Sequence, residues 1–91
     1  MKAHKILDLK LLHAKGIVQM RIWQLPESTI ERAHGLKYSL VYIVNDERVV
    51  GYDNELGKGD HKHVQGKELS YQFANIDQLI ADFKADIERL I

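Results

Sequence analysis

The chain has 91 residues, in which 13 Lys and Arg side chains balance 13 Asp and Glu, with five histidines besides. This length is typical of one domain, and the balanced charge excludes a polycation that binds nucleic acid over its whole surface. There is no cysteine, which excludes disulfides, thiolate metal sites and a cysteine nucleophile. No apolar run reaches the roughly 18 residues of a membrane span, and no signal-peptide pattern opens the chain. We therefore expect a cytoplasmic protein with a single domain over residues 1–91.

Two stretches near the start of the chain predict a β-hairpin. Apolar and polar side chains alternate over residues 6–13 and again over residues 17–25, which is the period of a half-buried strand. Residues 14–16 between them predict a short turn, in which Gly16 supplies a left-handed backbone conformation if one is needed. Pro26 ends the second strand because proline has no N–H to donate to a neighbouring strand.

A second hairpin is predicted from residues 37–44 and 47–53, which are rich in β-branched and aromatic side chains. Asn45 and Asp46 between them are typical turn residues. The chain then leaves the sheet, and we expect it to return briefly at residues 69–73.

The last segment, residues 76–90, predicts an amphipathic helix. Asn75 is a favourable N-cap, and Gln78 completes the pattern of a capping box. The apolar residues at helical spacing on one face are Ile76, Leu79, Ile80, Phe83, Ile87 and Leu90. Together the elements predict an α+β fold: an antiparallel four- to five-stranded sheet, built from two hairpins, with the C-terminal helix packed on one face.

The most polar stretch of the chain is YDNELGKGDHKH, residues 52–63. Its two glycines flank Lys58, but the P-loop pattern is absent and no helix start follows, so we do not expect a nucleotide cradle. A solvated loop with incidental histidines is one interpretation. The density of side chains that can ligate a metal or transfer a proton favours a functional site instead.

His61 and His63 are separated by one residue, so in an extended segment their side chains point the same way, about 7 Å apart at the backbone. This spacing fits two kinds of chemistry. The pair can ligate one metal ion with Asp53 or Asp60 beside it. It can instead act as acid and base on an RNA phosphodiester, where the 2′-hydroxyl is the nucleophile, because imidazole titrates near neutral pH.

The other polar and aromatic side chains divide into cations that support the histidines and residues that are weaker candidates. Three cations near the histidines would offset charge on the phosphorus: Arg48, Lys58 and Lys62. Three histidines are isolated in the sequence and are expected on the surface: His4, His13 and His34. The tyrosines are expected mainly to pack against one another, although aromatic rows can also stack bases.

The run KYSLVYIVNDERVVGYDNELGKGDHKH, followed by ELSYQF and NIDQLIADFKADIERLI, resembles the TumE family of small bacterial toxin-antitoxin proteins. The resemblance covers nearly the whole chain, including the opening hairpin that ends in RIWQLP. It implies a small intracellular toxin, encoded next to a helix-turn-helix antitoxin that neutralises it and binds DNA. It also draws attention, without assigning roles, to eight residues: Arg48, Tyr52, Asp53, Asn54, Lys58, Asp60, His61 and His63.

The sequence therefore favours an RNA-directed toxin, expected to be a metal-independent endoribonuclease without a cofactor. The expected catalytic residues are His61, His63, Lys58, Arg48 and Asp60. The expected binding residues are Tyr52, Asp53, Asn54 and Lys62, and no residue is assigned to a metal. Two alternatives stay open: a non-enzymatic module that binds an antitoxin or another protein, and a metal-dependent nuclease. We expect an antitoxin partner and no membrane contact, and a homodimer is left open.

Overall fold

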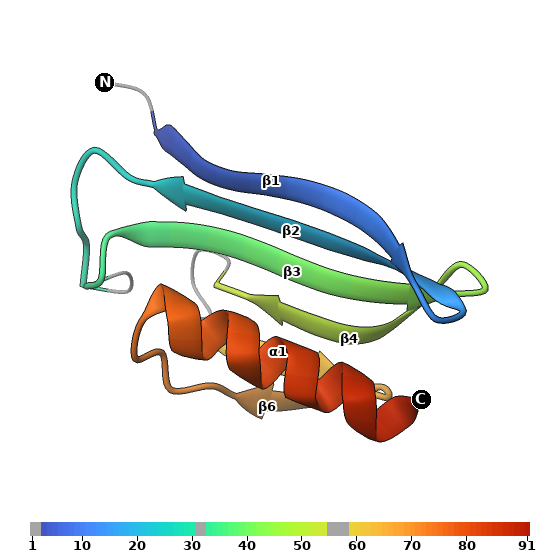
Figure 1. Cartoon of the computed structure of the whole chain (residues 1–91). Helices are drawn as coiled ribbons and strands as arrows, with labels where there is room; N and C mark the ends of the chain where they lie inside the picture. Colours follow the sequence, from blue (N-terminus) through green and yellow to red (C-terminus); the bar gives the residue numbers. More distant parts are fainter. Residues whose placement is uncertain (1–2, 31–32, 55–58) are drawn as a thin grey trace.

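In the computed structural model, which describes residues 3–30, 33–54 and 59–91, the chain forms an antiparallel sheet with a helix across one face (Figure 1). The strands lie in chain order across the sheet, and each pairs antiparallel with the next. The elements are β1 (His4–His13), β2 (Gly16–Gln24), β3 (Leu36–Val44), β4 (Glu47–Asp53), β5 (His61–Val64), β6 (Lys67–Ser70) and α1 (Ile76–Leu90). The predicted α+β class and C-terminal helix are confirmed. Within the described part of the chain, no helix is long and apolar enough to cross a membrane.

Within the described residues the sheet has six strands, so the predicted number of four to five is too low. The additional pair is the hairpin of β5 and β6, two strands of four residues each. Gln65 and Gly66 join them with φ of 50° and 83°, the left-handed pair that suits a two-residue hairpin turn. The strand predicted at residues 69–73 overlaps only the end of β6, which begins at Lys67 and ends at Ser70. The polar stretch is also not one loop, because it becomes strand again at His61.

The β1–β2 turn has its left-handed residue at an unexpected position. Ala14 adopts φ of 54°, whereas Gly16 has no positive φ and opens β2. Gly16 is needed for space, because a Cβ there would lie 2.7 Å from the ring of Tyr42 on the neighbouring strand. In the β3–β4 turn, Asn45 and Asp46 both adopt the left-handed conformation, which confirms the predicted turn.

The hydrophobic core lies between α1 and the sheet face that the helix covers. Leu79, Phe83 and Ile87 are at most 2% exposed and pack against inward side chains of β2, β3 and β4. The predicted apolar helix face is thus confirmed. Asn75 caps the helix, because its Oδ1 accepts from the backbone N–H of Gln78 at 2.8 Å. The Gln78 side chain donates to a carboxylate one turn later, so it does not complete the capping box.

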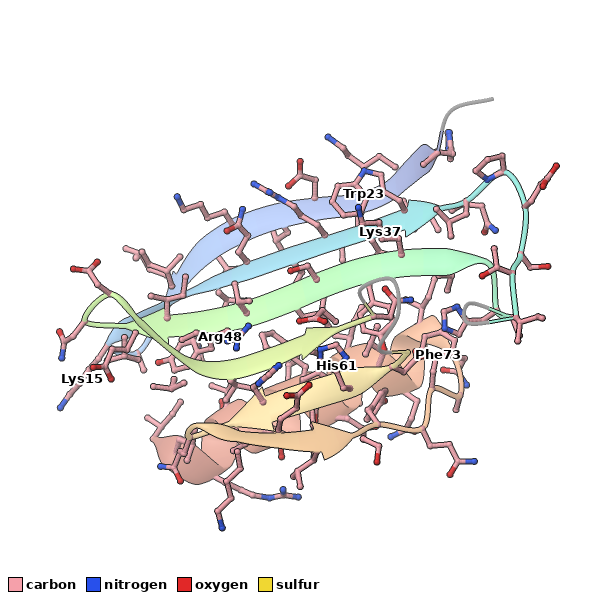
Figure 2. The ribbon with its side chains drawn as sticks, turned by 180° about the vertical axis from the view of Figure 1, so that it is seen from behind. Lys15, Trp23, Lys37, Arg48, His61 and Phe73 are labelled. Atoms are coloured by element: carbon pink, nitrogen blue, oxygen red, sulfur yellow. The ribbon has the colours of Figure 1, made fainter. Side chains whose placement is uncertain are left out.

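The opposite face of the sheet is not covered by the helix (Figure 2). Side chains alternate along each strand and directly paired residues share a face, so the strand register assigns each residue to one face. One row on the open face crosses the sheet through Asp8, Arg21, Ser39, Asp53, His61 and Ser70. The next row, on the helix side, is Leu9, Met20, Leu40, Tyr52, Lys62 and Leu69. The open-face row is entirely polar, and it contains Asp53 and His61 of the predicted site.

Candidate functional site

The alternation of side chains along β4 and β5 divides the predicted site residues between the two faces of the sheet. Asp53 lies opposite His61, and His63 follows two residues later, so all three side chains emerge on the open face. Tyr52 lies opposite Lys62, and both emerge toward α1. One polar stretch of sequence therefore supplies two structurally distinct sets of side chains.

Asp53, His61 and His63 form the open-face cluster. Oδ1 of Asp53 lies 2.7 Å from Nε2 of His61, and the two imidazole rings meet edge to face with centroids 5.2 Å apart. One possible ligand atom from each side chain lies within 4.8 Å of the other two. His61 is 5% exposed, whereas His63 is only partly buried. His63 is therefore the histidine that a molecule on this face can reach.

The second nitrogen of His61 is fixed by the backbone. Nδ1 lies 2.9 Å from the carbonyl oxygen of Gly59, which can only accept a hydrogen bond, so Nδ1 carries a proton. Nε2 is then the nitrogen directed at the cluster. Asp53 Oδ1 is buried beside it, yet it receives no aligned hydrogen bond from any described residue. A buried carboxylate oxygen without a donor is uncommon in folded proteins.

A β-bulge brings Arg48 to the open face as well. The β3–β4 register shifts between Tyr42 and Ile43, and Arg48 lies opposite Ile43. The extra residue puts Arg48 on the same side as Gly51, because a Cβ at Gly51 would lie 2.8 Å from Cδ of Arg48. Gly51 in turn lies opposite His63. The arginine side chain therefore crosses the bare glycine next to the open-face cluster.

On the helix side, Tyr52 and Lys62 contact a buried carboxylate of α1. The Tyr52 hydroxyl donates to Oδ2 of Asp86, and Lys62 Nζ lies 3.1 Å from the same oxygen. Arg89 donates to Oδ1 at 2.8 Å. Burial, together with the hydrogen bond to Asp86, raises the pKa of Tyr52 well above its usual range. These contacts attach the helix to the sheet.

Asn54 continues the pairing of β4 with β3 after the strand has ended. The residue is 1% exposed. Its Oδ1 accepts from the backbone N–H of Tyr38 at 3.0 Å, and its Nδ2 donates to the carbonyl of Leu36 at 2.7 Å. The side-chain amide thereby satisfies two buried backbone groups at the start of β3.

Asp60 belongs to a second cluster, on the side of the sheet toward Tyr38. Its Oδ2 accepts from the Tyr38 hydroxyl at 2.7 Å and lies 3.0 Å from Nε2 of His34. Nδ1 of His34 accepts from the backbone N–H of Leu36 at 3.1 Å, so Nε2 is the nitrogen that donates. Phe73 packs on the His34 ring at a centroid distance of 4.2 Å. The prediction that His34 is an isolated surface residue is therefore wrong, and no spacing pattern could link it to Asp60, 26 residues away.

The predicted site residues thus fall into three groups. Lys58 lies outside the described residues. The residues brought together on the open face are Arg48, Asp53, His61 and His63. Those with partners elsewhere in the fold are Tyr52, Asn54, Asp60 and Lys62.

The match to a known family extends over nearly the whole chain. A family model described as Toxin TumE matches residues 3–91. The chain belongs to the TumE family. This confirms the resemblance seen in the sequence and the expected role of the protein as a toxin, and a TumE toxin implies an antitoxin partner. No curated protein and no solved structure matches the chain.

Proposed function

We propose that this TumE-family toxin acts on RNA as an endoribonuclease, with its active centre at Asp53, His61 and His63. The observation that supports the proposal most directly is the position of His63, which shares the open face with a buried histidine–aspartate pair and with Arg48. Cleavage of an RNA phosphodiester needs proton transfer and stabilisation of charge on the phosphate, because the 2′-hydroxyl is already a built-in nucleophile. The cluster contains groups for both tasks.

The roles in this proposal follow from burial and charge. His63 is partly exposed and exchanges a proton with the substrate. His61, at 5% exposure and 2.7 Å from Asp53, supports the cluster from within the sheet face. The guanidinium of Arg48 suits a phosphate because its planar fork can donate two parallel hydrogen bonds.

The same face offers a surface for the rest of the RNA chain (Figure 2). Trp23 and Lys37 lie opposite each other on β2 and β3, with Lys37 Nζ 5.7 Å from the ring centroid of Trp23. A partly exposed aromatic ring can stack on an unpaired base, and a neighbouring lysine can contact a phosphate. Arg21 lies two residues before Trp23, in the row that leads to Asp53.

Incubation of purified protein with RNA, with and without EDTA, tests the proposal. We expect internal cleavage that His63→Ala reduces by ~10²–10⁴-fold. His13→Ala is the matched control, because His13 is another exposed histidine and lies at the β1–β2 turn, 3.0 Å from Glu88. Cleavage that EDTA abolishes would identify a metal-dependent nuclease, and cleavage that survives EDTA would support proton transfer by histidine alone. The proposal would be contradicted if the protein arrests growth on expression but leaves RNA intact in the purified assay.

A second candidate function, protein binding without catalysis, is favoured by an apolar groove on the helix side of the sheet. α1 packs over β4, which leaves side chains of β1 partly uncovered. A groove of about 440 Å³ is lined there by Leu9, Leu11, Val18, Met20, Phe83 and Ile87, with His13, Lys84 and Glu88. An amphipathic helix of the antitoxin fits such a groove, because its apolar side chains would cover Leu11, which is 41% exposed.

Leu11→Glu tests the groove as the antitoxin site. We expect the variant to weaken neutralisation by the antitoxin while toxicity persists, because a charge in the groove opposes an apolar partner. Leu12→Glu is the matched control, since Leu12 is 81% exposed and does not line the groove. Equal effects of the two substitutions would place the antitoxin elsewhere.

A further inference from the structure

We propose that Asp53, His61 and His63 hold a divalent transition-metal ion. Two imidazoles and one carboxylate form a common ligand set for such ions. Histidine nitrogen favours zinc, iron or nickel over magnesium and calcium, which prefer oxygen ligands. A nitrogen of His63 that binds an ion cannot also transfer a proton, so a bound ion would favour the metal-dependent alternative over proton transfer by His63. The ion site does not depend on activity toward RNA, because its occupancy can be measured in the protein alone.

The positions of the three side chains allow them to share one ion. One ligand atom from each lies within 4.8 Å of the others, from the paired strands β4 and β5. Ligand atoms of a zinc ion lie about 2.0–2.2 Å from the metal and therefore on the order of 3–4 Å from one another. A modest rotation of the partly exposed His63 closes the remaining difference, while Asp53 and His61 are already adjacent.

The hydrogen bond on the far side of His61 is the arrangement that metal ligands typically have. A ligating histidine usually donates its other ring N–H to a carbonyl or carboxylate, which fixes the tautomer and the ring orientation. Nδ1 of His61 makes this contact with the carbonyl of Gly59 at 2.9 Å. Nε2 is left with its lone pair toward the cluster.

The buried oxygen of Asp53 is the second observation that points to an ion. Oδ1 lies 2.7 Å from Nε2 of His61 but receives no aligned hydrogen bond from any described residue. Asp53 Oδ1 and His61 Nε2 can both face one cation, for which their separation of 2.7 Å has to widen to about 3–4 Å. An ion bound by both would satisfy the carboxylate oxygen and remove its unfavourable burial.

A site of this composition keeps coordination positions open. The three residues supply three ligands, and catalytic metal sites typically complete the shell with water or substrate. Glu68 lies opposite His63 on β6, with Oε1 3.9 Å from Nε2 of His61. Its carboxylate is near enough to orient a molecule bound at an open position.

Zinc binding by tag-free protein, treated with EDTA and then dialysed, tests the proposal. We expect calorimetry to give one Zn²⁺ per chain and Mg²⁺ to leave that binding unchanged. Asp53→Asn and His63→Gln should each lower zinc affinity by at least ~100-fold. His13→Gln, an exposed histidine outside the cluster, should leave it unchanged. Co²⁺ should produce visible d–d absorption in the parent protein and lose it in both cluster variants, whose folding is checked by circular dichroism.

The result that would overturn the proposal is absence of zinc binding, or binding that Asp53→Asn and His63→Gln leave intact. An equal loss in His13→Gln would show that the ion binds elsewhere. Zinc binding without RNA cleavage would preserve the ion site and remove the ribonuclease proposal. Cleavage in EDTA by a protein that binds no zinc would overturn the ion site and support the ribonuclease proposal.

Discussion

Lys62 Nζ lies 3.1 Å from Oδ2 of Asp86, on the helix side of the sheet. Its two neighbours in the sequence, His61 and His63, emerge on the opposite face. The alternation of a strand thus separates a lysine from the histidines that flank it. A cation within a polar motif is therefore not necessarily a cation at the site, and this distinction can be tested.

Lys62→Met is expected to lower the free energy of unfolding by about 1–3 kcal/mol, because it removes a donor to a buried carboxylate. The salt dependence of RNA binding should not change. Lys37→Met, on the open face, is the matched control. Its free energy of unfolding should stay within ~0.5 kcal/mol of the parent protein, and the salt dependence of its RNA binding should decrease by about one charge. Urea unfolding and RNA titrations at several salt concentrations measure both quantities. If Lys62→Met instead reduced the salt dependence of RNA binding and left stability unchanged, Lys62 would contact the RNA.

Phe83→Ala is expected to lower the free energy of unfolding by ~3–5 kcal/mol, because the ring is fully buried between α1 and the sheet. Ile80→Ala, on the partly buried edge of the same helix, should cost less. Urea denaturation compares the two. A loss at Phe83 no larger than at Ile80 would contradict the packing described for α1.

Residues 76–90 were predictable as a helix because the roughly 3.6-residue spacing of the apolar side chains, the N-cap at Asn75 and the single apolar face all indicate the same element. The first two hairpins were predictable because their strands alternate clearly and turn residues stand between them. The β5–β6 hairpin was not predictable in the same way, because HKHV lacks apolar alternation and its pairing depends on β4. The bulge that turns Arg48 toward Gly51 is likewise set by register with β3. The contact of His34 with Asp60 depends on tertiary structure alone. Local pattern therefore predicted the first two hairpins, the helix and the shared face of the two histidines. The β5–β6 hairpin, the face on which Arg48 lies and the partner of His34 depend on the assembled sheet.

Stability is expected to fall at alkaline pH because of three tyrosines. Burial and hydrogen bonds to carboxylates raise the pKa of Tyr38, Tyr52 and Tyr71 well above the usual range. The folded state keeps protons that the unfolded state releases, so this stabilisation is complete below the unfolded pKa of about 10 and is lost as pH rises toward the folded values. Well above that unfolded pKa, each tyrosine contributes a decrease of about 1.4 kcal/mol per pH unit.

Urea unfolding between about pH 9 and about pH 11 measures this slope, and tyrosinate absorption follows ionisation. Tyr71→Phe should reduce the decrease of stability with pH by the contribution of one tyrosine. Tyrosinate absorption that rises at the ordinary pH in a protein that is still folded would contradict the expected shifts.

Gly51→Ala is expected to reduce RNA cleavage by ~10–100-fold, because the new Cβ would displace Arg48 from its position across Gly51. The substitution should not destabilise the strand, since Gly51 has no positive φ and alanine restricts the unfolded chain. Combining it with Arg48→Ala should add little to the loss caused by Arg48→Ala alone. A cleavage rate equal to that of the parent protein would show that the placement of Arg48 does not matter for activity.

His61 and His63 differ in burial, so their variants separate a structural role from a functional one. His63→Ala should change the free energy of unfolding by less than ~0.5 kcal/mol, because the ring is partly exposed. His61→Ala should cost about 1–3 kcal/mol, because a ring that is 5% exposed loses its contacts with Gly59 and Asp53. Each substitution should nevertheless lower cleavage by ~10²–10⁴-fold, and the double variant should be little worse, since residues that act as a unit are not additive. Cleavage assays and growth arrest on expression measure function, and urea unfolding measures stability. If the double variant folds and still arrests growth, the open-face cluster is not the source of toxicity, and protein binding without catalysis becomes the leading explanation.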